Sequence, residues 1–458
     1  ISIFDTMLSL FMVLAVTCFY RAIEASRALR RDGKALPGFS PRSWSALAWG
    51  AVAAGVLTKG PVALAVPLLV AVPYAAWRKE WRPIWNPWGL LVFVALVAPW
   101  LVAVERQEPG FLHYALVIET WKRLTTDEMR RTGPVWYFVP YLMGGAFPWS
   151  IVAAAGWLRS RTERSGAGDA RHRWVFLALW LALPFLLFSF SQSKRPQYIL
   201  PLIPALTITV AGLWSGRAEP DDESPRSSSF LPGKVAASVV FMILGAALTL
   251  AGVAMDSEAF GVDGSILPLA RRSAIVLGLF CLAGGFGAWR SRRWTTAVIG
   301  LSAPVILFPL AVGPLVSAVA DSRSSRHLAE LVRSQPEGSG SVAVFEHFPL
   351  SLPFYLGHTV DFVTEDAVAL RSGFVERSYA QLLARPHSTL RDHDWWYRTV
   401  AACPSPYVLL VPERYQDQMA ILEASGRENL GGDEEMSVFG PCRQRLRPAP
   451  EETGGREE

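Results

Sequence analysis

Charged residues are scarce in this sequence: Asp, Glu, Lys and Arg make up 18% of its 458 residues, against about 25% in a typical soluble domain. Hydrophobic residues reach 51%, with 18 Trp and 24 Phe, and they fall in long runs. This composition excludes an intrinsically disordered chain and an ordinary soluble enzyme. It indicates an all-α polytopic membrane protein with one smaller polar part.

Several motifs of known chemistry are also missing. The four cysteines form no CxxC pair and no zinc-binding spacing. There is no P-loop, GxGxxG or Ser/His/Asp arrangement, which disfavours nucleotide-driven chemistry and favours a donor that is already activated on a lipid. No internal repeat is evident, which weakens the case for an inverted-repeat transporter. The net charge of +5 resides in short basic clusters between apolar runs, a pattern that sets membrane topology rather than nucleic-acid binding.

About ten apolar runs are long enough to cross a bilayer, which takes about 20 residues. The predicted spans are residues 4–22, 43–59, 61–77, 88–105, 135–157, 174–191, 197–214, 235–254, 273–290 and 295–319. Basic clusters follow the odd-numbered spans, which places those loops in the cytoplasm. The outer side then holds Asp5, Lys59, the loops 105–134 and 191–197, and everything after residue 320.

The start of the chain bears on this topology. Ile1 is preceded by no initiator Met and no signal peptide, and it falls on the outer side. We therefore expect Ile1 to begin a fragment, with an odd number of helices preceding it in a longer protein.

The polar part follows the transmembrane domain predicted for residues 1–320. Strands are predicted at 341–345, 359–363 and 407–411, and helices at 375–383 and 415–425. We expect residues 321–446 to form a small extracytoplasmic α/β domain and residues 447–458 to be a disordered tail. Cys403 and Cys442 of this domain either pair in an oxidising compartment or stay reduced.

Two outer polar residues lie at span ends. Asp5 opens span one, where a carboxylate binds a metal ion or a sugar hydroxyl, or simply complements the helix dipole. Lys59, in Leu57-Thr58-Lys59-Gly60-Pro61, is either a point charge for a lipid phosphate or a snorkelling lysine at a tight turn.

Two outer loops carry further candidates. Glu119 and Arg123 of loop 105–134 are four residues apart, which fits an ion pair on an interfacial helix or a binding site in a long loop. Lys194 and Arg195 are adjacent cations on the outer side, against the topological trend, and this favours a phosphate or pyrophosphate partner. Tyr198 would bound a lipid or sugar site, although interfacial tyrosines are common.

These motifs occur in an order that resembles a known family. Residues 57–61, Glu119 with Arg123, Phe147-Pro148-Trp149 and residues 193–201 resemble those of bacterial aminoarabinose-transferase-like glycosyltransferases. These are relatives of the protein O-mannosyltransferases, with the GT-C membrane fold. The helix start at Asp5 and the segment 351–356 fit the same family.

The resemblance implies a multi-pass enzyme of the bacterial inner (plasma) membrane with a periplasmic C-terminal domain. It would take a sugar from a polyprenyl (undecaprenyl) phosphate donor and transfer it to a lipid A-like glycolipid, another glycan or a protein. About thirteen helices are usual in the family, so three would precede the ten predicted here. The family's catalytic carboxylate lies in its first periplasmic loop, which falls upstream of Ile1, so no catalytic residue is assigned.

The resemblance also suggests roles for individual residues. Lys59, Lys194 and Arg195 would bind the donor phosphate and stabilise it as it leaves, and the direct displacement would invert the anomeric centre. The remaining candidates would bind substrate: Asp5, Glu119, Arg123 and Tyr198. The family's Glu-His pair reads Glu119-Thr120 here, so no metal ligand is assigned and a divalent cation is left open.

Two other functions remain as alternatives. A transporter or flippase of lipid-linked sugars would use the same outer cations, but the predicted spans are nearly free of charge, unlike those of most transporters. A non-catalytic membrane scaffold that binds glycan is the second alternative.

Overall fold

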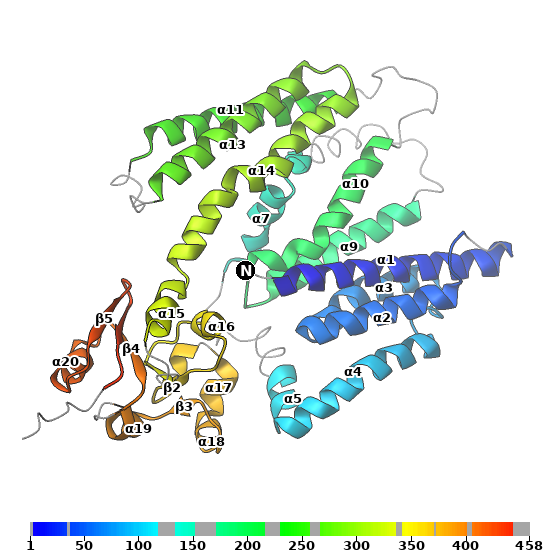
Figure 1. Cartoon of the computed structure of the whole chain (residues 1–458). Coiled ribbons are helices and arrows are strands. Elements are labelled where there is room, and N and C mark those ends of the chain that lie inside the picture. Colours follow the sequence, from blue (N-terminus) through cyan, green and yellow to red (C-terminus); the bar gives the residue numbers. More distant parts are fainter. Residues whose placement is uncertain are drawn as a thin grey trace, which may run out of the picture. The chain divides into compact units, whose positions relative to one another are not determined.

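The computed structural model describes residues 3–33, 37–117, 133–151, 171–215, 230–256, 266–335, 341–370, 372–400 and 405–442. The chain divides into two compact units, Ile1–Val312 and Gly313–Glu458. The first unit is helical and the second contains a β-sheet (Figure 1).

The described residues of unit 1 are mainly helical. Its helices are α1 (Ile3–Asp32), α2 (Pro41–Lys59), α3 (Val62–Arg78), α4 (Pro87–Gln107), α5 (Phe111–His113), η2 (Val135–Tyr137), α7 (Phe138–Gly145), α9 (Arg171–Phe190), η3 (Pro196–Leu202), α10 (Ile203–Ser215), α11 (Phe230–Ala254), α13 (Leu267–Arg290) and the first part of α14 (Trp294–Ser322). The remainder of α14, from Gly313, belongs to unit 2. Among the described residues, six helices are long and apolar enough to cross a membrane, namely α1, α4, α9, α11, α13 and α14. The chain is therefore a multi-pass membrane protein.

Six is fewer than the ten predicted spans. The predicted spans 43–59 and 61–77 correspond to α2 and to the 17-residue helix α3. The predicted span 135–157 is described only as far as residue 151, and there it holds η2 and α7. The count of ten thus stays a prediction.

Two helix boundaries differ from the prediction for identifiable reasons. Helix α1 continues ten residues past the predicted end at residue 22, because nothing from Ile23 to Asp32 interrupts a helix and the first glycine is Gly33, with φ of +62°. The predicted span 197–214 begins as the 3₁₀-helix η3, since Pro196 and Pro201 cannot donate backbone hydrogen bonds.

Helices α1, α2, α3 and α9 of unit 1 share a core. Phe19 of α1 meets Trp49 of α2 edge to face, with ring centroids 5.7 Å apart. Tyr74 of α3 lies against Phe176 of α9 at 5.0 Å. The indole of Trp180 donates a 3.1 Å hydrogen bond to the carbonyl of Pro201, which fixes the end of η3 to α9.

Unit 2 is built on a six-stranded sheet in the order β3-β2-β1-β4-β6-β5. The strands are β1 (Val342–Phe345), β2 (Asp361–Val363), β3 (Leu390–Arg391), β4 (Val408–Pro412), β5 (Asn429–Gly432) and β6 (Met436–Phe439). The first four in spatial order are parallel, and β6 and β5 continue the sheet antiparallel. The strands predicted at 341–345, 359–363 and 407–411 correspond to β1, β2 and β4.

Short helices cover both faces of this sheet. They are α15 (Arg326–Arg333), α16 (Leu352–Leu356), η4 (Val368–Leu370), α17 (Gly373–Arg377), α18 (Tyr379–Leu383), α19 (His393–Trp395), η5 (Trp396–Val400) and α20 (Gln416–Ala424). Val344 and Phe362 face a core with Leu328 of α15, whereas Phe345 faces a second core with Trp396. The single helix predicted at 375–383 is two helices, because the chain turns at Ser378.

The cysteines fall into two classes. Cys18 and Cys281 are free and buried in helices of unit 1. Cys442 is disulfide-bonded, which agrees with an oxidising compartment. Cys403 lies outside the described residues.

Candidate functional site

The helices of unit 1 bring the predicted outer residues to one end of the bundle. Asp5 lies in the first turn of α1, Lys59 is the last residue of α2, and residues 191–198 follow the end of α9. Tyr198 belongs to the same apolar cluster as Leu8 of α1 and Ala63 of α3. We call Asp5, Lys59, Ser189, Ser191, Ser193, Lys194, Arg195 and Tyr198 the site end. Figure 1 shows the start of α1 beside the junction of α9 and α10.

Asp5 and Lys59 form an ion pair across the site end. The Lys59 ammonium donates to a carboxylate oxygen of Asp5. The Asp5 side chain is 6% exposed and that of Lys59 is 32% exposed. The turn that holds Lys59 depends on Gly60, whose φ of +85° favours glycine. The two residues were predicted as separate binding groups, but the structure joins them in an ion pair.

Lys194 folds back onto the end of α9. Its ammonium donates to the carbonyl of Ser191, one of the carbonyls that a helix C-terminus leaves unpaired. Its side chain is buried, and a Cβ at Gly133 would lie 3.2 Å from its Cδ. Burial lowers the pKa of Lys194, and an anion beside the ammonium would oppose this shift. Lys194 thus shapes the loop as well as adding charge.

Arg195 differs from its neighbour. Its side chain is half-buried, and within the described part of the chain it makes no ion pair. Its backbone carbonyl accepts the 3.1 Å hydrogen bond of Tyr198 N–H, which starts η3. A guanidinium with five donors that pairs with no carboxylate among the described residues suits bidentate binding of a phosphate.

Tyr198 is surrounded by aromatic rings. Its ring lies 5.5 Å from that of Phe188 and 6.5 Å from that of Phe138, which is fully buried. These contacts give the site end an apolar wall next to the cations. Such a wall is consistent with either a lipid chain or a sugar ring, as predicted for Tyr198 from the sequence.

Two serines at the site end have unusual surroundings. The hydroxyls of Ser189 and Ser193 are buried, and neither finds a hydrogen-bond partner among the described residues. A buried hydroxyl without a partner costs free energy, and such groups concentrate where a ligand or a water completes them. Ser189 was not predicted, because a lone serine in an apolar run gives no signal.

The remaining predicted residues are only partly accounted for. Glu119 and Arg123 lie outside the described residues. At the start of the same loop, the carboxylate of Glu105 accepts backbone N–H groups of Gly110 and Leu112, both at 2.9 Å. Glu105 therefore holds the turn into α5.

The other end of the bundle has a different chemistry, and we call it the paired end. The Glu24 carboxylate accepts two hydrogen bonds from Arg78, at 2.6 and 2.7 Å, and one from Tyr74 at 2.6 Å. Glu80 is buried, accepts from Ser26 at 3.1 Å and lies 3.5 Å from Arg30.

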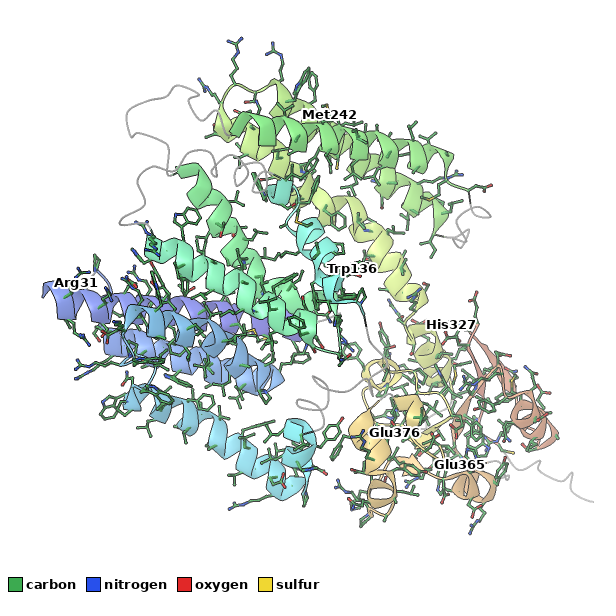
Figure 2. The ribbon with its side chains drawn as sticks, turned by 180° about the vertical axis from the view of Figure 1, so that it is seen from behind. Arg31, Trp136, Met242, His327, Glu365 and Glu376 are labelled. Carbon is green, nitrogen blue, oxygen red and sulfur yellow. The ribbon has the colours of Figure 1, made fainter. Side chains whose placement is uncertain are left out.

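These pairings at the paired end were not predicted from the sequence, which places Glu24 in a loop. Figure 2 shows Arg31 at this end of α1, away from the segment that carries Trp136.

A second polar cluster lies at the carboxyl edge of the sheet in unit 2. His393 follows β3, and its two ring nitrogens lie 2.7 Å from Glu346 and 3.0 Å from Glu365. The carboxylates sit on opposite sides of the ring, so the three groups cannot bind one ion together. Within the described residues, no group of three or more His, Cys, Asp or Glu side chains is arranged to hold a metal ion.

Comparisons with known proteins agree with the predicted resemblance. Residues 1–115 match the family model of dolichyl-phosphate-mannose-protein mannosyltransferases. An undecaprenyl phosphate-alpha-4-amino-4-deoxy-L-arabinose arabinosyl transferase of Pectobacterium atrosepticum is 31% identical over 336 residues, which cover 70% of this chain and 55% of that protein. The protein of the same name from Erwinia tasmaniensis is 28% identical over 309 residues, with 63% and 50% covered. The chain thus spans about half the length of the curated relatives it matches.

A solved structure has a similar fold. It is ArnT from Cupriavidus metallidurans, crystallised with undecaprenyl phosphate, and it matches with a TM-score of 0.73 at 22% identity. The match covers 95% of this chain and 74% of that one. The predicted resemblance is therefore confirmed: the chain is a relative of the aminoarabinose-transferase-like membrane glycosyltransferases, which are related to the protein O-mannosyltransferases and have the GT-C fold.

Proposed function

We propose that this protein is a glycosyltransferase that moves a sugar from a polyprenyl-phosphate donor to a lipid A-like glycolipid, another glycan or a protein. The observation that carries the proposal is the site end, where one short segment of chain holds Arg195, two buried hydroxyls that find no partner among the described residues, and Tyr198 with its aromatic neighbours. This combination suits a ligand with a phosphate and an apolar chain. The names of the relatives, which are arabinosyl transferases using undecaprenyl phosphate, support the same class of donor.

We infer a different role for each cation of the site end. Arg195 would contact the donor phosphate directly and stabilise the charge that develops as it leaves. Lys194 would add positive charge and hold the loop through Ser191. Lys59 would contact the phosphate while it remains ion-paired with Asp5.

In the proposed reaction, an acceptor oxygen forms a bond to the anomeric carbon while the bond from that carbon to the phosphate oxygen breaks. The proton of the acceptor goes to a base that we do not assign. Glu119, Arg123 and Tyr198 stay candidates for binding the sugar or the acceptor, as does Asp5. We assign no role to a divalent cation, which remains a candidate cofactor.

We further infer how the protein is placed in the cell. The ten predicted segments would cross the bacterial inner membrane, with the site end at the periplasmic face. The domain predicted at residues 321–446 would lie in the periplasm, and the disulfide-bonded state of Cys442 supports an oxidising compartment. The predicted transmembrane domain would comprise residues 1–320.

The test is transfer in detergent solution. Purified protein is incubated with radiolabelled undecaprenyl phosphate-linked sugar and a lipid A acceptor, and release of undecaprenyl phosphate is measured together with labelling of the acceptor. A transferase consumes the donor without any sealed compartment. Intact donor in detergent, together with movement of the donor across proteoliposomes, would instead establish a flippase.

A further inference from the structure

Two apolar side chains of unit 2 are exposed to an unusual degree. Leu350 is 74% exposed and Phe354 is 82% exposed. In α14, the membrane-spanning residues Ile306 and Leu310 reach 71% and 73%. Water-facing domains rarely present neighbouring large apolar groups in this way, and such groups mark an interaction surface.

The surrounding chain shows that these two side chains are directed outward by the local fold. Phe348 packs edge to face on the core residue Phe362, with centroids 5.2 Å apart. Leu352 is fully buried, and Tyr355 packs against the same core. The segment 348–356 therefore packs against the core through Phe348, Leu352 and Tyr355, whereas the described residues leave Leu350 and Phe354 exposed.

This exposed pair is tied to the end of a membrane helix. Ser325 donates to the Ser351 hydroxyl through its backbone N–H at 2.9 Å, and the two hydroxyls are also 2.9 Å apart. Arg333 donates to the carbonyl of Tyr355. Helix α16 is thus fixed to α15, which begins only four residues after α14 ends at Ser322.

The short connection limits how far α15 lies from the bilayer. Four residues span at most about 14 Å, so α15 begins within about this distance of the end of α14. Figure 2 marks this position with His327, on α15 directly after α14. The exposed apolar pair is therefore carried on an element that is continuous with a membrane-spanning helix.

Basic side chains accompany the apolar pair. Arg323, Arg326 and Arg333 are all exposed. Arg326 lies 3.2 Å from Glu330 in an exposed pair, whereas Arg323 makes no ion pair within the described part of the chain. Arginine flanking an apolar surface is the arrangement by which protein segments bind anionic lipid headgroups.

We propose that Leu350 and Phe354 insert into the interfacial region of the bilayer that α14 crosses, and that Arg323 and Arg333 contact anionic headgroups beside them. The partner is the lipid surface itself. Unit 2 is then anchored at two points, by α14 and by this docking surface.

Spin labelling of the full chain tests the proposal. Leu350→Cys, Phe354→Cys and Ile421→Cys are each made and labelled with a nitroxide in nanodiscs of phosphatidylcholine with phosphatidylglycerol. Ile421 is the control, because it is an exposed apolar residue of α20 in the same unit. Cys18 and Cys281 are buried, and the unsubstituted protein gives their background labelling.

The expected result is that labels at 350 and 354 collide preferentially with oxygen, at a depth of about 5–10 Å below the headgroups, whereas the label at 421 collides with the water-soluble nickel complex. Adding Arg323→Glu with Arg333→Glu should reduce the depth at 354 in phosphatidylglycerol, but not in pure phosphatidylcholine.

Two outcomes would overturn the proposal. Water-like collision at 354 would show a freely exposed surface. An immobile label that neither oxygen nor nickel reaches would show that the surface packs against protein.

Discussion

The two ends of the helical unit are built from the same kinds of side chain but use them differently. At the paired end, Glu24 receives hydrogen bonds from Arg78 and Tyr74, and Glu80 receives one from Ser26. At the site end, Arg195 makes no ion pair within the described residues, and Ser189 has a buried hydroxyl without a partner there. This difference separates the polar groups that stabilise the bundle from those that are available to bind a ligand.

The largest effect is expected at the paired end. Glu24→Gln should lower the free energy of unfolding by about 3–5 kcal/mol, because it leaves Arg78 without its anionic partner in a poorly solvated position. Chemical unfolding in detergent measures this. Glu330→Gln removes one partner of an exposed pair and serves as the control, with no measurable change expected. Equal midpoints for the two variants would contradict a stabilising role of the paired end.

The next effect is expected in catalysis at the site end. Arg195→Ala should reduce transfer by about 10²–10³-fold, as the loss of a group that stabilises developing charge does. Its unfolding free energy should not change, since Arg195 forms no ion pair with any residue that the structure describes. Lys194→Met should lower both activity and stability, because Lys194 also holds the carbonyl of Ser191.

The matched control for both cations is Gln192→Ala, an exposed position in the same loop. It should leave transfer and unfolding unchanged. Full transfer activity in Arg195→Ala would remove this residue from the donor site and end the contrast between the two neighbouring cations.

Ser→Ala substitutions at the two ends test the same difference on a smaller scale. Ser26→Ala and Ser45→Ala at the paired end remove hydrogen bonds to Glu80 and to the carbonyl of Pro83, and each should cost about 1 kcal/mol of unfolding free energy. Ser189→Ala and Ser193→Ala remove hydroxyls that have no hydrogen-bond partner among the described residues. Both substitutions should therefore leave stability unchanged or raise it, while the affinity for the donor falls. Similar destabilisation by all four substitutions would show that the site-end hydroxyls are structural.

Breaking the ion pair of the site end by Asp5→Asn is expected to cost much less stability than breaking the Glu24–Arg78 pair. Lys59 is about one-third exposed and can be solvated when its partner is neutralised, so the unfolding free energy should fall by less than about 1 kcal/mol. Binding of undecaprenyl phosphate should be kept or tightened, because a carboxylate near the phosphate is removed. Isothermal titration with undecaprenyl phosphate measures this. If Asp5→Asn lowered the unfolding free energy as much as Glu24→Gln does, the ion pairs at the two ends would contribute equally to stability.

Much of the helical fold was predictable because apolar runs determine membrane helices. The positions of α4, α9, α13 and α14 follow directly from hydropathy. The predicted end of α1 at residue 22 was wrong. The apolar run ends there, but the residues that follow favour a helix as far as Asp32. Strand β5 was also missed, because Asn429–Gly432 contains two glycines and little β-forming sequence.

The candidate site was predictable only in part. The sequence identified Asp5 and Lys59, but not their pairing, because 54 residues separate them. Lys194 and Arg195 were indistinguishable as two adjacent cations, and only the fold shows that one is folded back onto α9. Whether the Ser189 hydroxyl finds a hydrogen-bond partner depends on the residues that surround it in the fold, which the sequence alone does not reveal. Among the described residues it has none.

The unbroken length of α1 has a consequence for how lipids act on this protein. Thirty helical residues extend about 45 Å, whereas the hydrocarbon core is about 30 Å thick. The same stiff rod carries Asp5 near its start and Glu24 in its second half. A change in bilayer thickness that alters the tilt of α1 therefore displaces both ends in opposite directions, and hydrophobic mismatch becomes a means of tuning the geometry around Asp5.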